Sequence, residues 1–202
     1  MGVFKYQSPE RALFGFGSLQ GIQDEIRSRK LTKALLVTGR DLADTAIVKN
    51  VIYALEAADT GYALFTDFKP NPTTNNVNQG SDAFIRNQCD FLISVGGGSA
   101  HDCAKAISVV AAGGGKIEDY TGADKSSRAY PLIAVTTTAG TGSECTSDYV
   151  VVDEAQNRKY GNSDRNVLPV LAVDDYELMM NMPASLTAGT GMDALTHAVE
   201  AY

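Results

Sequence analysis

The sequence lacks an excess of basic residues, a long apolar run and a paired set of cysteines. Its 17 Lys and Arg face 24 Asp and Glu, a net charge of −7, whereas a protein that mainly binds nucleic acid needs a basic face. No uncharged apolar run approaches the ~20 residues that span a bilayer. Three cysteines without paired spacing predict reduced thiols. We therefore expect a cytoplasmic protein that binds neither nucleic acid nor a membrane.

What is present is a regular alternation of strand and helix patterns in 202 residues, 44% of them apolar. Apolar runs, several of them continuous as in strands covered on both faces, occur at residues 35–37, 62–65, 91–95, 132–135 and 170–173. Helical patterns alternate with them at residues 18–29, 41–58, 74–87 and 99–112. Residues 150–153 and 159–160 predict a hairpin. The alternation predicts an α/β fold with a doubly wound parallel sheet, a Rossmann-like domain.

A domain boundary is predicted at Pro183, because proline disfavours helix in the residue before it and a helical pattern starts at Ala184. Residues 1–183 then form the α/β domain, and residues 184–202 begin a second, helical domain. The helical pattern runs to Tyr202 without the glycine, proline or basic last turn that commonly ends a helix. We therefore expect this sequence to be the first half of a larger protein.

A strand that runs into three glycines is the first candidate site. In Ser94–Ser99 the glycines Gly96, Gly97 and Gly98 leave room for a ligand, and the following helix presents free N–H groups to an anion. The pattern favours a pyrophosphate cradle over a simple turn capped by Ser99. Asp102 and Lys105 lie on the same helix face as Ser99, either as part of this site or as an exposed surface pair.

A second candidate loop follows the strand at residues 132–135. Residues 136–144 hold five hydroxyl side chains and two glycines, which offer many hydrogen-bond donors and little bulk. Loops of this composition are often solvated turns. Because parallel strands end at the same edge of a sheet, we favour the alternative that this loop forms a second wall of the site.

Asp193 and His197 are a candidate metal-ligand pair. They lie one helical turn apart and therefore on one face, where a carboxylate and an imidazole suit Fe²⁺ or Zn²⁺. Such a pair is more often an ordinary surface contact. The other histidine, His101, is expected to be structural or solvent-facing.

Together these stretches resemble the iron-containing (group III) alcohol dehydrogenases, and within them the branch of 1,3-propanediol dehydrogenases and lactaldehyde reductases. The segments that carry the resemblance are 69–73, 96–105, 137–144, Asp174-Asp175 followed by Pro183, and Gly191–Tyr202. They run in order through nearly the whole chain, so their joint specificity is high.

The resemblance implies a nucleotide-binding α/β domain followed by an all-helical domain that holds a metal. It implies that Gly97, Gly98 and Ser99 hold the pyrophosphate and that Asn71 lies near the adenine. Asp102, on the helix face of Ser99, is counted with these cofactor-binding residues. Residues toward the nicotinamide would be Thr137, Thr138, Lys159 and Leu178. Asp193 and His197 would be the first two ligands of Fe²⁺ or Zn²⁺, with two further histidines expected from the missing half.

The implied activity is reversible hydride transfer between a small primary alcohol or diol, or its aldehyde, and NAD or NADP. Gly39 stands where many NAD-preferring relatives carry aspartate, and Arg40 follows it, which favours NADP or dual use. The alternative is that Arg40 points to solvent and Asp41 only caps the next helix, which would leave NAD and NADP nearly equal. The full-length protein is expected to be a homo-oligomer, and these 202 residues alone to be inactive. Alternatives are a nucleotide-binding module without catalysis and an enzyme similar to glycerol dehydrogenase or dehydroquinate synthase.

Overall fold

The computed structural model describes residues 6–202 and contains a six-stranded, all-parallel sheet. The strands follow the order β1-β8-β5-β4-β2-β3 across the sheet. Their bounds are Arg11–Phe14 (β1), Lys33–Thr38 (β2), Gly61–Phe65 (β3), Phe91–Gly96 (β4), Leu132–Thr136 (β5) and Leu171–Asp174 (β8). The predicted doubly wound α/β fold is thereby confirmed.

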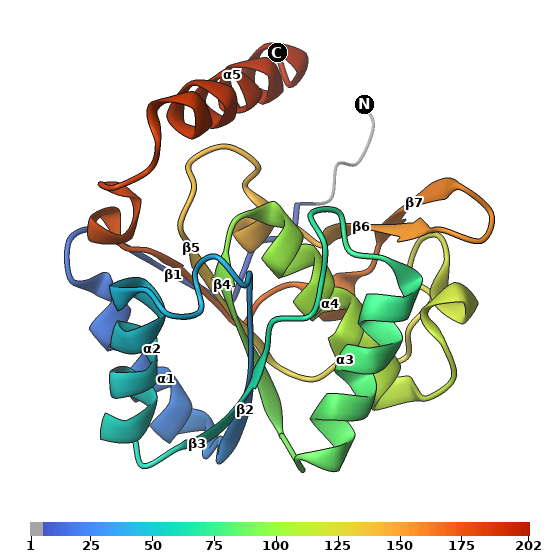
Figure 1. Cartoon of the computed structure of the whole chain (residues 1–202), viewed down its shortest axis with the longest axis horizontal. Coiled ribbons are helices and arrows are strands. Elements are labelled where there is room, and N and C mark those ends of the chain that lie inside the picture. The colour runs from blue at the N-terminus through green and yellow to red at the C-terminus, as the bar shows by residue number, and fades with distance from the viewer. Residues whose placement is uncertain (1–5) are drawn as a thin grey trace.

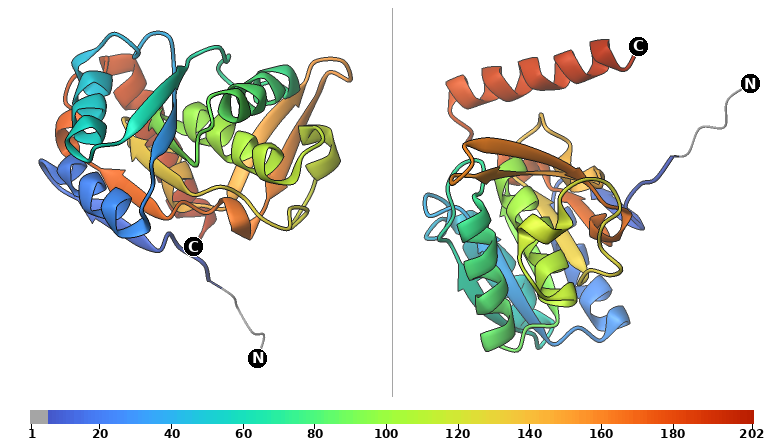
Figure 2. Two further views of the ribbon diagram at one scale, coloured as in Figure 1. Left: turned by 90° about the horizontal axis from the view of Figure 1, so that it is seen from below. Right: turned by 90° about the vertical axis from the view of Figure 1, so that its right-hand side faces the viewer.

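Helices cover both faces of the sheet (Figures 1 and 2). One face packs on α1 (Ile22–Arg29) and α2 (Ala46–Ala57), and the other on α3 (Thr74–Arg86) and α4 (Gly98–Gly113). Alternate residues of each strand serve alternate faces: in β2, Leu36 joins the core on the α1 and α2 side, and Leu35 the core on the α3 and α4 side. This two-sided burial explains why the strands read as continuous apolar runs.

A separate hairpin and several short 3₁₀ turns complete the described part of the chain. Strands β6 (Asp148–Asp153) and β7 (Arg158–Ser163) pair antiparallel, so the predicted hairpin is confirmed. The 3₁₀ turns are η1 (Ser18–Gly21), η2 (Ile117–Tyr120), η3 (Ser143–Cys145), η4 (Arg165–Val167) and η5 (Tyr176–Met179).

Three elements differ from the sequence prediction. Strand β1 was not predicted, because it is an exposed edge strand held by pairing with β8 rather than by apolar burial. The helix predicted from residue 18 is a 3₁₀ turn followed by α1. The helix predicted from residue 41 begins only at Ala46, since Leu42 and Ala43 first donate to the carbonyl of Gly39 in a turn.

The last helix, α5 (Ala184–Glu200), starts directly after Pro183, where the sequence predicts a domain boundary. None of its residues is buried. It lies over the carboxyl ends of the sheet strands (Figure 1), and Thr190 packs against Gly140 of the loop after β5, where a Cβ on the glycine would lie 2.7 Å from the Thr190 carbonyl oxygen. No described helix is long and apolar enough to cross a membrane.

Candidate functional site

The order of the sheet reverses between β2 and β4, which pair side by side in parallel. From β2 the chain moves outward to β3, crosses back to β4, and then continues in the opposite direction to β5 and β8. In open α/β sheets the carboxyl ends of the strands at such a reversal form the usual ligand crevice. The loops that follow β2 and β4 are therefore the expected position of a ligand site.

Residues Gly96–Gly98, the glycine turn, join β4 to α4. They pack tightly against residues 136–144 after β5, which we call the threonine loop. A Cβ on Gly97 would lie 2.9 Å from Thr138 Oγ1, and a Cβ on Gly98 would lie 3.0 Å from Thr141 Cγ2. The Thr137 N–H donates to the Gly96 carbonyl at 3.0 Å. The two predicted loops thus form one unit, and only residues without a side chain fit at its centre.

The amino end of α4 is open to an anion. Gly97 is the N-cap, and no described side chain caps it. The first N–H groups of a helix lack partners within the helix and carry the positive end of its dipole. A cradle of this kind, bare of side chains, fits a phosphate or pyrophosphate group.

Three predicted site residues from distant segments form a chain of contacts beside this cradle. The Asn71 N–H donates to Ser99 Oγ at 3.2 Å, and Lys159 Nζ donates to Asn71 Oδ1 at 3.4 Å. Asn71 has a positive φ of 57°, a conformation that asparagine tolerates better than most residues. The bend there turns residues 70–72 toward both α4 and β7.

These side chains line a pocket of about 670 Å³, together with Gly98, Asp102 and His197. The volume lies in the range of small-molecule and cofactor sites. The walls come from α4, the threonine loop, the β6–β7 hairpin and α5. The pocket thus connects the candidate phosphate cradle with the candidate metal pair.

Asp102 and Lys105 fasten the loop before β6 to α4, so the alternative of an exposed surface pair is wrong. Lys105 is fully buried, and its Nζ donates to the carbonyls of Ser143 at 2.6 Å and Asp148 at 2.8 Å. The Asp102 carboxylate accepts from Ser143 Oγ at 2.9 Å and from the Val150 N–H at 3.1 Å. Burial lowers the pKa of Lys105 to about 8 and raises the pKa of Asp102.

His101 is a buried structural residue, one of the two roles expected for it. Its side chain is fully buried, with Nδ1 2.8 Å from Ser94 Oγ of β4. Burial lowers its pKa to about 3, with Lys105 adding to the effect. The ring is therefore neutral at ordinary pH and ties α4 to the sheet behind the glycine turn.

The candidate metal pair lies on α5, with Asp193 Oδ1 3.8 Å from His197 Nε2. Their side chains are 42% and 55% exposed, respectively. Among residues 6–202 no group of three or more His, Cys, Asp or Glu could hold a metal ion. An oxygen and a nitrogen donor suit Fe²⁺ or Zn²⁺, but catalytic sites commonly use three protein ligands. The pair fits part of such a site.

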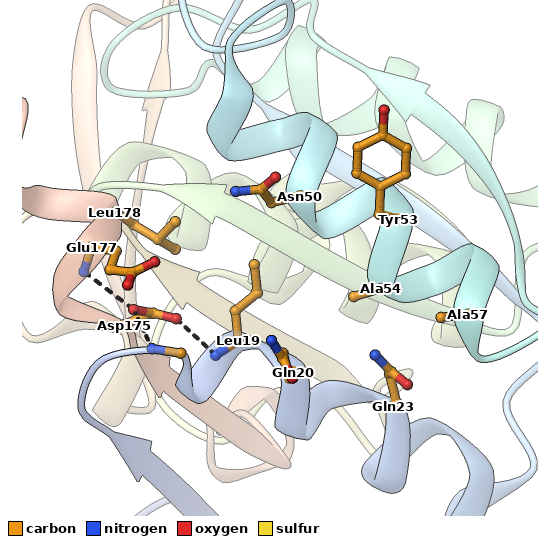
Figure 3. A pocket seen from close by; sticks show the side chains of 11 residues that line it. Leu19, Gln20, Gln23, Asn50, Tyr53, Ala54, Ala57, Asp175, Glu177 and Leu178 are labelled. Carbon is orange, nitrogen blue, oxygen red and sulfur yellow. Dashed lines mark hydrogen bonds between the residues drawn. The ribbon is translucent and has the colours of Figure 1, made fainter.

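Leu178 is the one predicted cofactor residue that the structure places elsewhere. It is 6% exposed and packs into the core beside α1 and α2. It lines a different pocket, of about 400 Å³, in which the Asp175 carboxylate accepts N–H donors from Gly17 and Leu19 (Figure 3). Its role toward the nicotinamide stays a prediction.

A further pocket, of about 370 Å³, lies where the sheet order reverses. It is lined by Gly39–Leu42 after β2, by Phe68 and Pro70 after β3, and by Gly96–Ala100 of the glycine turn except Gly98. Ser99 lines both this pocket and the larger one, so the two flank the phosphate cradle. Sequence reasoning missed Phe68, and considered Asp41 only as a helix cap.

Comparison with known proteins assigns this arrangement to a family. The model of the family described as iron-containing alcohol dehydrogenase matches residues 9–176. The chain belongs to the iron-containing alcohol dehydrogenase family. Alcohol dehydrogenase 4 of Schizosaccharomyces pombe is 44% identical over 100% of this chain and 48% of its own length. The NAD-dependent methanol dehydrogenase of Bacillus methanolicus is 42% identical over 96% of this chain and 51% of its own length.

Solved structures of this family share the fold. The crystal structure of a 1,3-propanediol oxidoreductase superposes with a TM-score of 0.95 at 38% identity, over 98% of this chain and 52% of that one. The chain thus spans about half the length of the relatives it matches.

Proposed function

We propose that this chain supplies the nicotinamide dinucleotide site, and two ligands of the metal site, of an alcohol dehydrogenase. The reaction is reversible hydride transfer between a small primary alcohol or diol and NAD or NADP, in which the alcohol carbon gives a hydride to the nicotinamide and its hydroxyl loses a proton. The observation that carries the proposal is the glycine turn packed against the threonine loop, at a pocket that His197 also lines.

The chain's own residues bind and orient the cofactor in this proposal. The open amino end of α4 and Ser99 hold the pyrophosphate, and Lys159 adds a positive charge to the same pocket. Thr137 and Thr138, which we place toward the nicotinamide, contact the glycine turn at Gly96 and Gly97, and Thr141 of the same loop lines the pocket. The Asp102–Ser143–Lys105 network fixes the distance between α4 and the loop before β6, which sets the width of the pocket. Such fixed geometry is what brings a nicotinamide and an alcohol carbon into reacting position.

Asp193 and His197 are the residues of this chain that would hold Fe²⁺ or Zn²⁺. Such an ion, when bound, supplies Lewis acidity toward the substrate oxygen. His197 lines the same pocket as Ser99 and Lys159, which supports placing the substrate between the metal and the cofactor.

We further propose that the protein acts in the cytoplasm and forms homo-oligomers in its full-length form. Free thiols at Cys89, Cys103 and Cys145 support a reducing compartment. Size-exclusion chromatography of the full-length protein with light scattering tests the proposed homo-oligomer.

Isothermal titration calorimetry with NAD⁺ and NADP⁺ tests the cofactor site. Gly98→Val is expected to weaken binding at least tenfold, because its side chain would occupy the phosphate cradle and press on Thr141. Gly61→Val is the matched control, since a Cβ there makes only ordinary contacts at the opposite end of the sheet. Unchanged affinity in Gly98→Val would remove the cradle from the proposal.

A further inference from the structure

The pocket between the ends of β2 and β4 has the geometry of a nucleoside site. Its floor is the glycine turn, and Phe68 and Pro70 supply an apolar wall. The third wall is the turn at Gly39–Leu42, directly after Thr38, which pairs with Val95 of β4. In dinucleotide-binding sheets, an acidic residue at the end of the strand next to the glycine turn reads the adenosine ribose. The side chains of this third wall decide what the pocket accepts.

Asp41 brings a carboxylate back over the position of Gly39. A Cβ on Gly39 would overlap Asp41 Oδ1, so the carboxylate occupies the space that a side chain at residue 39 would fill. The turn that folds it back is held by the Gly39 carbonyl, which accepts from Leu42 and Ala43 at 3.1 Å each. The absence of a carboxylate at residue 39 is thus compensated in space by residue 41.

Arg40 is already paired with another carboxylate. Its guanidinium donates to Asp67 Oδ1 at 2.6 Å. Lys69, which lies between the pocket-lining residues Phe68 and Pro70, pairs with Glu154 at 2.7 Å. The charges beside the pocket are therefore two carboxylates, Asp41 and Asp67, against one guanidinium, and the guanidinium is engaged. A dianionic 2′-phosphate would meet net negative charge there.

We propose that Asp41 accepts a hydrogen bond from the adenosine ribose and makes this chain select NAD over NADP. The proposal rests on the proposed function, and it replaces the sequence-based expectation that Arg40 favours NADP. Arg40 instead holds Asp67, which precedes the apolar wall of the pocket. The carboxylate accepts from a free 2′-hydroxyl and repels a 2′-phosphate, so one side chain provides both attraction and rejection.

The test is a calorimetric measurement of the Kd ratio of NADP⁺ to NAD⁺. The ratio is expected to be at least tenfold in the unmodified protein and to fall about tenfold in Asp41→Asn. Asp44→Asn is the matched control, because Asp44 is an exposed aspartate of the same turn that does not line the pocket. In Asp67→Asn the released Arg40 is expected to strengthen NADP⁺ binding several-fold.

The possible results distinguish the role of Asp41 from the proposed function. If NAD⁺ binds but the ratio is the same in Asp41→Asn and the unmodified protein, the role of Asp41 is wrong while the dinucleotide site stands. If the unmodified protein prefers NADP⁺, Arg40 reads the phosphate and the inference is overturned. If neither nucleotide binds, the proposed function itself fails. Titration with 5′-AMP and 2′,5′-ADP repeats the comparison without the nicotinamide half, and the same preference for the unphosphorylated ribose is expected.

Discussion

His101 and Lys105 are fully buried titratable residues one turn apart on α4. They differ in charge at neutral pH. His101 gives up its charge, since burial lowers its pKa to about 3. Lys105 has a pKa of about 8, so it stays charged at neutral pH, where carbonyl and hydroxyl oxygens surround its Nζ. One residue anchors α4 to the sheet, and the other anchors the loop before β6 to α4.

The neutral state of His101 predicts an acid-sensitive stability. Between pH 6.5 and pH 3 the unfolded chain binds a proton at His101 that the folded chain does not, so the free energy of unfolding falls as pH falls. From pH 7 to pH 5 this one group is expected to contribute a loss of about 2 kcal/mol. Urea unfolding of the unmodified protein and of His101→Gln at the two pH values measures this loss in the free energy of unfolding.

The control for this prediction is His197→Gln, which removes an exposed histidine of α5 and is expected to leave the loss between pH 7 and pH 5 unchanged. The same pH dependence in His101→Gln and in the unmodified protein would show that His101 is not the group that titrates.

Individual residues differ in how far the sequence determined their place. Gly96–Gly98 were predicted to be a candidate site because a strand followed by three glycines and a helix is a pattern typical of a phosphate-binding turn. Lys105 could not be assigned, because helical spacing places it on a face without saying whether solvent or the 141–148 loop covers that face. Asp41 was expected to cap the next helix, but Thr45 is the N-cap of α2, because the turn that closes on the Gly39 carbonyl keeps residues 41–45 out of the helix.

Helices α4 and α5 have similar lengths but opposite environments. α4 has 16 residues, most of them buried between the sheet, α3 and the hairpin. α5 has 17 residues and none of them is buried; Met192, Leu195 and Val199 are 61%, 55% and 68% exposed. Most helical stability in proteins comes from packing an apolar face rather than from intrinsic propensity.

Amide hydrogen exchange is therefore expected to differ strongly between the two helices in the 202-residue chain. α5 should exchange at least a hundredfold faster than α4, because it opens without unfolding the rest of the protein. Mass spectrometry of peptides from residues 98–113 and 184–200 measures the difference. Equal protection of both helices would mean that another surface covers α5, and chromatography of the same sample would then reveal an oligomer.

The elements that the sequence predicted best are those whose burial it encodes. The central strands were found because both of their faces are covered, which requires uninterrupted apolar residues such as Leu35–Val37. Strand β1 was not predicted because its pairing with β8 depends on backbone hydrogen bonds, which do not require any particular pattern of side chains. The start of α2 was misplaced for a related reason, since polar residues 41–45 fit a helix as well as they fit the turn.

In the proposed function, the residues that bind the cofactor are separate from the residues that hold the metal. The candidate phosphate cradle, most of the lining of both pockets beside it and the network of Lys105 come from α4, the loops around it and the β6–β7 hairpin. Only His197 of the larger pocket belongs to α5. The candidate metal pair supplies two donor side chains, and the part of the chain that the structure describes offers no third.

The 202-residue chain is accordingly expected to bind a nicotinamide dinucleotide and to turn over no alcohol. Two ligands on an exposed helix hold a divalent ion weakly, whereas catalytic sites usually combine at least three with an open position. Absorbance at 340 nm, with primary alcohols and diols, Fe²⁺ or Zn²⁺ and each cofactor, measures turnover, and calorimetry on the same sample measures binding. Binding without turnover is the expected pair of results. Metal-dependent turnover that Asp193→Asn abolishes would contradict it, and would mean that a second copy of the chain completes the metal site.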